Sequence, residues 1–120
     1  MIRDNVSCMK SIKALCDENG VDLIVVAGPV FFSKRAEFEC NAYYDYMEQL
    51  VEVVNVWDFT GITNINNNPH NFYDPTHYND AVANEMIKTI FNDTQMNEEF
   101  GILLTNDNVE FYLYNRKKDF

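Results

Sequence analysis

Basic side chains are scarce in this chain. Its 120 residues hold 9 lysines and arginines against 19 aspartates and glutamates, which gives a formal net charge of -10 at pH 7. A surface this acidic repels phosphate backbones and anionic lipid headgroups, and the sequence has no basic stripe to offset the repulsion. The composition therefore argues against nucleic-acid binding and against attachment to an anionic membrane surface.

Long apolar runs are also missing. The longest, Val21 to Phe32, is interrupted by Asp22, Gly28 and Pro29, and it falls short of the roughly 18 residues that span a bilayer. The first five residues lack the charged-then-apolar pattern of a signal peptide. Taken as it stands, the sequence predicts a soluble chain that is not exported.

Cysteine is rare as well. The three cysteines, Cys8, Cys16 and Cys40, are an odd number and form no CxxC motif, so neither a disulfide framework nor a zinc site is encoded. Cys8 and Cys16 fall in a helical pattern, and we expect them to be small buried or half-buried thiols. Hydrophobic residues, by contrast, are plentiful at 47% of the chain, which argues against intrinsic disorder and is enough for the core of one domain.

Apolar periodicity predicts alternating helices and strands. Helical spacing covers residues 4–19, 34–51 and 79–91, while β-branched runs at 21–27 and 53–57 and a tail segment at 100–105 are typical of strands. The run Val21–Ala27 is almost continuously apolar, which predicts a parallel strand buried on both faces. Residues 58–77 are predicted to be a structureless loop, and 109–114 fit either a hairpin strand or a terminal helix.

This order of elements predicts a single α/β domain over residues 1–120. We expect a three-layer α/β/α fold with a small parallel sheet, similar to part of a flavodoxin-like domain. Three strands are few for such a fold, so the pattern predicts half of a larger doubly wound domain. A sheet lacking its first strands exposes an edge and apolar surface, so we also expect the chain to self-associate as a homo-oligomer.

The segment with most chemical content runs from Asn71 to Asn79. Asp74 and His77 lie three residues apart before a predicted helix, and Pro75 keeps Asp74 out of helical geometry. The carboxylate can then accept a proton from one imidazole nitrogen and leave the other as a general base. The alternative is that Asp74 caps the helix and His77 is an ordinary surface residue.

Two further readings involve other residues. Ser33 follows the first predicted strand and is either the N-cap of the second helix or a replacement nucleophile. Asp58, His70 and Asp74 are suitable metal ligands, although their spacings match no compact metal motif. We predict no metal and no cofactor.

The stretch Phe72-Tyr73-Asp74-Pro75-Thr76-His77-Tyr78 resembles the last block of the SGNH (GDSL-like) hydrolases, in which Asp-x-x-His supplies two members of a Ser-His-Asp triad. The preceding strands, ending in Ala27-Gly28-Pro29-Val30 and Trp57-Asp58-Phe59, match the element order of the C-terminal half of that fold over residues 4–92. The similarity is greatest to bacterial members that modify cell-surface polymers. It implies Asp74 and His77 as catalytic residues, an acyl ester or acylated carbohydrate as substrate, and a parent protein that is extracytoplasmic and membrane-anchored.

The chain departs from that family in its missing nucleophile. It contains no Gly-x-Ser and no Gly-x-Asn-Asp, and its serines are Ser7, Ser11 and Ser33. Without a nucleophile and oxyanion donors, an Asp-His pair cannot carry out acyl transfer. Two hypotheses follow. The chain is the C-terminal part of an SGNH-type esterase or acyltransferase that is inactive alone, or it is a non-catalytic α/β module that binds a partner chain.

Overall fold

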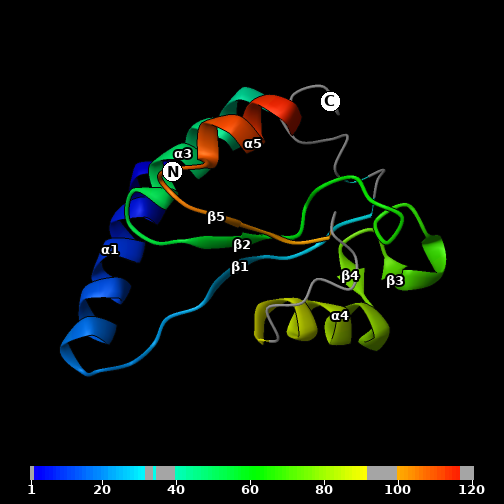
Figure 1. The fold of residues 1–120 in the computed structure, drawn as a ribbon, viewed down its shortest axis with the longest axis horizontal. Coiled ribbons are helices and arrows are strands. Elements are labelled where there is room, and N and C mark those ends of the chain that lie inside the picture. The colour runs from blue at the N-terminus through cyan, green and yellow to red at the C-terminus, as the bar shows by residue number, and fades with distance from the viewer. Residues whose placement is uncertain (1, 32–33, 35–39, 92–99, 117–120) are drawn as a thin grey trace.

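The computed structural model of the chain describes residues 2–31, 34, 40–91 and 100–116. Helices cover both faces of a small central sheet (Figure 1). The helices α3 (Cys40–Val51) and α5 (Val109–Arg116) lie on one face, and α4 (Asp80–Phe91) lies on the other. The structure is thus a small α/β fold, as the alternating pattern predicted.

The predicted helices agree with the structure within the described residues. The helix α1 (Ile2–Glu18) covers the first of them, and α4 begins one residue after the predicted start. The second predicted helix corresponds to α3, while residues 35–39 of that prediction lie outside the described part. The ambiguous segment 109–114 forms α5, because the Asn108 side chain accepts the Thr105 N–H and closes a turn that leads into a helix.

The sheet is mixed rather than parallel, which corrects the prediction. Its order is β1 (Val25–Ala27), β2 (Val56–Asp58), β5 (Ile102–Leu104). The first two strands are parallel, but β5 runs antiparallel to β2. Gly101 packs against the ring of Phe59, the residue that follows β2. Because β5 begins where β2 ends, it must run back along it.

The first strand is shorter and more exposed than predicted. The sequence suggested a strand over residues 21–27 buried on both faces, yet only Val25–Ala27 are paired. Val21, Ile24 and Val26 are exposed. Val21 and Ile24 precede the paired residues, and no other described strand pairs with the outer edge of β1, where Val26 lies.

The central strand β2 supports both layers of the core. Val56 and its β5 neighbour Leu104 point into a cluster with α3 and α5, while Trp57 packs against the α4 cluster that contains Val82 and Met86. Alternate side chains of a strand point to opposite faces, so three residues of β2 are enough to join the two halves of the core. The predicted strand, residues 53–57, begins three residues before the observed one. The backbone N–H groups of Val53 and Val54 instead donate to the Leu50 carbonyl and end α3.

The segment 58–77 is organised, which corrects the prediction of a structureless loop. It contains a short 3-10 helix (Pro69–Asn71) and most of a hairpin formed by β3 (Phe72–Asp74) and β4 (His77–Tyr78). Buried polar side chains such as Asn66 and Thr63 hold its earlier part by hydrogen bonds. Hydrophobic periodicity does not detect a segment that is held by hydrogen bonds of buried polar side chains.

The apolar stripe of α1 is only partly used. Val6 is buried, but Ile12 and Leu15 are exposed, and so is Cys8. The expectation of buried or half-buried thiols is therefore wrong for Cys8 and correct for Cys16, which is half-buried; nothing is described of the Cys40 side chain. No described helix is long and apolar enough to cross a membrane.

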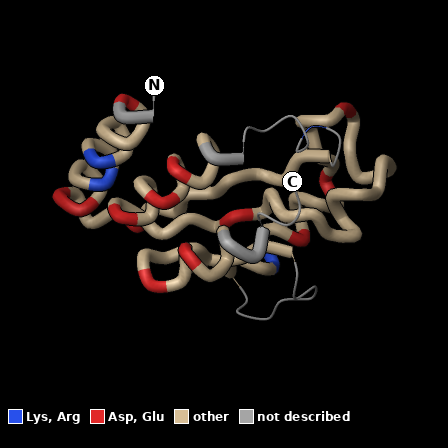
Figure 2. Tube along the Cα trace, turned by 90° about the horizontal axis from the view of Figure 1, so that it is seen from above, with Lys and Arg blue, Asp and Glu red and all other residues tan. Residues whose placement is uncertain are grey.

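Acidic residues occur on every described α-helix. Figure 2 shows Asp and Glu positions on each of the helices α1, α3, α4 and α5, with few Lys and Arg positions between them. The lysine ion pairs of the described residues join near neighbours on one helix, such as Lys13 and Asp17. Pairs of this kind contribute little to stability, so the fold depends on its two apolar clusters.

The close contact of Gly101 with Phe59 predicts a sharp difference between two glycines. Gly101→Ala should cost about 2–5 kcal/mol of unfolding free energy, because Gly101 has φ 88° and a Cβ there meets the buried Phe59 ring. Gly20 has φ 65° but open space around it, so Gly20→Ala should cost only about 1–2 kcal/mol. Urea unfolding measures both, and equal losses would contradict this packing.

No described strand pairs with the outer edge of β1, and this edge predicts self-association at tens of micromolar, an order-of-magnitude concentration for such surfaces. Sedimentation should show species larger than the monomer. Val26→Lys should reduce them, because an exposed lysine on an edge strand opposes strand pairing. Phe111→Lys, at an exposed position on α5, is the matched control and should not. A clean monomer of the unsubstituted chain would contradict the expectation.

Candidate active site

The β3–β4 hairpin lies at the end of the sheet where β1 and β2 finish (Figure 1). Asp74 is the last residue of β3 and His77 the first of β4, and the two are partners across a turn formed by Pro75 and Thr76. The sequence predicted a carboxylate and an imidazole brought together ahead of a helix. They do meet, but across a two-residue hairpin turn rather than at the first turn of a helix.

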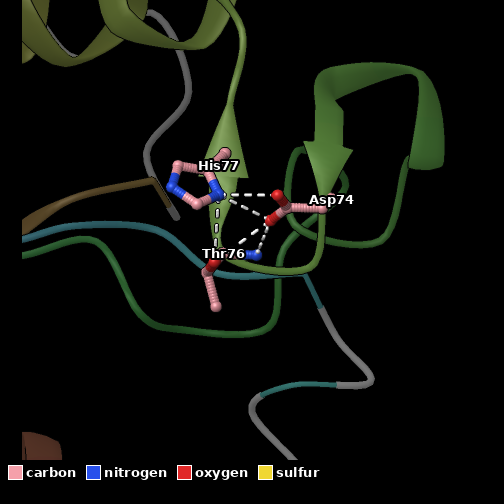
Figure 3. Close-up of polar contacts among 3 residues, drawn as sticks. All are labelled: Asp74, Thr76 and His77. Carbon is pink, nitrogen blue, oxygen red and sulfur yellow. Dashed lines mark hydrogen bonds and ion pairs between the residues drawn. The ribbon is translucent and has the colours of Figure 1, made fainter.

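Asp74 and His77 are bonded to each other. Nδ1 of His77 lies 2.7 Å from each carboxylate oxygen of Asp74 (Figure 3). A carboxylate can only accept, so the proton of the neutral imidazole sits on Nδ1 and Nε2 keeps its lone pair. Nε2 points away from Asp74 and has no hydrogen-bond partner among the described residues. The His77 side chain is 71% exposed, so this nitrogen is accessible.

The turn itself holds the carboxylate in place. Oδ1 of Asp74 accepts the backbone N–H of Thr76 at 2.9 Å and the Thr76 hydroxyl at 3.0 Å. The Thr76 N–H, and next the hydrogen bond from His77, lower the pKa of Asp74 from 3.8 to about 2. Hydrogen bonds to the charged form favour ionisation. Asp74 is therefore an anion over the whole physiological range.

The hairpin is anchored to both neighbouring segments. The Phe31 N–H, in the loop after β1, donates to the Pro75 carbonyl at 2.9 Å. Asn79 follows the hairpin directly, and its side chain accepts the Val82 N–H at 3.2 Å. The cap of α4 is thus Asn79, and the alternative that Asp74 caps this helix is wrong.

A shallow hollow of about 250 Å³ adjoins the Asp74 side of the hairpin, and sequence reasoning missed it. Its lining is mostly aromatic and proline: Phe31, Pro69, Phe72, Tyr73, Asp74 and Pro75. Tyr73 is 77% exposed, and the rings of Phe31 and Phe72 lie 5.7 Å apart. The only sequence signal was the clustering of Phe72 and Tyr73 beside Asp74, since Phe31 comes from a distant segment.

The other candidate residues do not join this pair among the described residues. Ser7 and Ser11 are exposed on α1, at the far end of the molecule from the hairpin (Figure 1), and Ser33 lies outside the described residues. Asp58 is fully buried and accepts hydrogen bonds from the Thr60 N–H and hydroxyl. It is therefore not part of a set with His70 and Asp74, and the described residues contain no group of three potential metal ligands.

The hydrogen bonds to Asp74 predict how its pKa responds to substitution. His77→Ala should raise the Asp74 pKa from about 2, but not as far as 3.8, because the Thr76 N–H remains. Thr76→Val removes the hydroxyl, which lowers the Asp74 pKa less than the Thr76 N–H does and also contacts His77 Nδ1 at 3.1 Å, and it should raise the Asp74 pKa less than His77→Ala. The carboxyl ¹³C shift followed against pH measures all three proteins, and an Asp74 pKa indifferent to His77→Ala would contradict the assigned bond.

The lowered pKa of Asp74 also predicts how the stability of the fold depends on pH. The folded state binds a proton at Asp74 less readily than the unfolded chain, whose pKa is near 3.8. The contribution of Asp74 is therefore fully present above that value and is lost as the pH falls through about 2.

Comparison with protein-family models, with curated proteins and with solved structures finds no match to this chain.

Proposed function

We propose that Asp74 and His77 are the orienting acid and the general base of a Ser-His-Asp triad whose nucleophile comes from outside this chain. The observation that carries the proposal is the 2.7 Å contact between Nδ1 and the carboxylate, with Nε2 exposed at the carboxyl end of the parallel pair of strands. Ligands of open α/β sheets bind at this end.

The roles follow from the protonation states. As the nucleophilic oxygen attacks an ester carbonyl, Nε2 of His77 takes its proton and the imidazole becomes positive. Asp74, held ionised by the Thr76 N–H, stabilises that charge and keeps Nδ1 protonated. The imidazolium then gives the proton from Nε2 to the departing alkoxide, and water repeats the cycle on the acyl intermediate.

The resemblance of residues 4–92 to the C-terminal half of SGNH hydrolases gives the substrate class. We propose an ester-linked acyl group, on a carbohydrate in the bacterial members that modify surface polymers. A missing Gly-x-Ser and missing oxyanion donors mean that the chain alone is inactive toward such esters. A nucleophile-bearing polypeptide that completes the sheet is therefore part of the proposal.

One observation favours the second candidate, a non-catalytic module that binds a partner chain. Asp74 already has a structural role, because its carboxylate closes the turn through the Thr76 N–H and hydroxyl. This role needs neither a substrate nor His77. The two candidates therefore differ in what His77 does, and the test is built on that residue.

The experiment follows p-nitrophenyl acetate hydrolysis with and without a serine-bearing N-terminal half of an SGNH protein. The isolated chain should be no faster than its His77→Ala variant. The reassembled domain should be active, and its activity should fall by about 10³ or more with His77→Ala and by less with Asp74→Asn. His70→Ala, which changes the other exposed histidine, is the matched control and should leave the rate unchanged.

Two results would overturn the proposal. A reassembled, active domain that is indifferent to His77→Ala returns the Asp74–His77 pair to a structural role. Robust activity of the isolated chain that disappears with Ser33→Ala makes Ser33 the nucleophile and removes the need for a second polypeptide.

A further inference from the structure

Asn66 is a fully buried asparagine whose side chain joins three segments. It lies eight residues after the end of β2 and has no exposed surface. Its Oδ1 accepts the Thr63 hydroxyl at 2.6 Å. Its Nδ2 donates to the carbonyl of Val30, 36 residues away in the loop after β1, and to the carbonyl of Phe59 just after β2. Both carbonyls can only accept, so the orientation of the amide is fixed.

The Val30 carbonyl continues into a chain of hydrogen bonds. It shares one peptide group with the Phe31 N–H, which donates to the Pro75 carbonyl at 2.9 Å. The Pro75 carbonyl shares the next peptide group with the Thr76 N–H, which donates to Oδ1 of Asp74 at 2.9 Å. Two rigid peptide planes therefore connect the buried Asn66 amide to the carboxylate that binds His77.

We propose that Asn66 is a positioning residue for the Asp74–His77 pair, acting through the Val30–Phe31 and Pro75–Thr76 peptide groups. Its relevance to catalysis rests on the function proposed above, whereas the hydrogen-bonded connection does not. Asn66 touches no reacting atom.

Each link of the connection acts in the same direction. A peptide group whose carbonyl accepts a hydrogen bond is polarised and becomes a better donor at its N–H, so successive bonds strengthen one another. The Asn66 amide polarises the Val30–Phe31 peptide, which polarises the Pro75–Thr76 peptide, whose N–H then binds Asp74 more strongly. The Thr76 N–H is the largest cause of the low Asp74 pKa, so the effect is measurable at that carboxyl.

The residue type at position 66 matches this task. The site needs one acceptor for the Thr63 hydroxyl and two donors for two carbonyls, which an asparagine amide supplies and a carboxylate of the same shape does not. The connection contains no other ionisable side chain, because Thr63, Phe59, Val30, Phe31, Pro75 and Thr76 do not titrate in the range of Asp74. His77 is the one titratable group with an ion pair or hydrogen bond to Asp74 in the described part of the chain.

The test compares Asn66→Ala with Asn108→Ala by NMR of the full chain. Asn108 makes a similar pair of bonds, to the Thr105 N–H and the Leu103 carbonyl. It follows β5, which runs antiparallel to β2, so it lies at the opposite end of the sheet. Asn66→Ala should move the Thr76 amide proton upfield and raise the Asp74 pKa from about 2 toward 3.8. Asn108→Ala should leave both signals unchanged.

A folded Asn66→Ala variant with unaltered Thr76 and Asp74 signals would overturn the proposal. Should that variant fail to fold, Thr63→Val replaces it. This change keeps the Asn66 amide but removes the hydroxyl that orients it and that also accepts the Ile65 and Asn66 backbone N–H groups, so it should shift both signals less and in the same direction. The unsubstituted chain gives an independent check through scalar couplings across the hydrogen bonds from Asn66 Nδ2 to Val30 and from the Phe31 N–H to Pro75. Absence of either coupling would mean that the corresponding hydrogen bond does not form, and it would overturn the proposal.

An activity arm separates this inference from the proposed function. In the reassembled esterase, Asn66→Ala should lower kcat more than it raises KM, because the substrate does not touch Asn66. If the reassembled domain shows no esterase activity but the NMR shifts appear, the proposed function fails and the positioning role stands. If the domain is active and depends on His77 while the shifts are absent, the positioning role alone fails.

Discussion

The parallel contact between β1 and β2 is the constraint on which the rest of the structure depends. It sets Val25 beside Val56 and Ala27 beside Asp58, so the loops that follow the two strands leave the sheet at the same end. Everything with chemical content is built on those loops. The Asn66 amide joins them, and the Phe31 N–H anchors the hairpin to one of them. A slip of one residue in this register would turn Val56 out of one core and Trp57 out of the other.

Helices were predictable because their signal is local. The stripe Val82, Met86 and Thr89 recurs at helical spacing and is buried in α4, and the apolar residues of α3 are buried at the same spacing. Strands were less predictable, because what buries a strand residue is its neighbour across the sheet. Val26 and Val56 are both valines in β-branched runs, yet Val26 is 39% exposed and Val56 is 1% exposed. Val26 lies on the edge strand β1, whereas Val56 lies on the central strand β2.

The Asp74–His77 pair was predictable and its setting was not. Three-residue spacing with a proline indicated that the two side chains could meet, and they do at 2.7 Å. The hydrogen bond from Phe31 and the hollow beside Asp74 both involve a segment more than forty residues earlier in the chain. Asn66 carries no motif at all. Its importance comes from three hydrogen bonds that only the folded backbone brings within reach.

Asp74 and His77 differ in how much the fold needs them. The turn is complete without an imidazole, because the Thr76 N–H and hydroxyl already satisfy Asp74 Oδ1. The His77 ring is largely exposed, and its hydrogen bonds within the described part of the chain go to Asp74 and Thr76. An exposed side chain with local partners adds little to stability, so burial and packing give no account of a histidine at this position. A general base, by contrast, needs one nitrogen fixed by a carboxylate and the other open to a reactant. That asymmetry between the two residues is the physical basis for proposing catalysis rather than a purely structural turn.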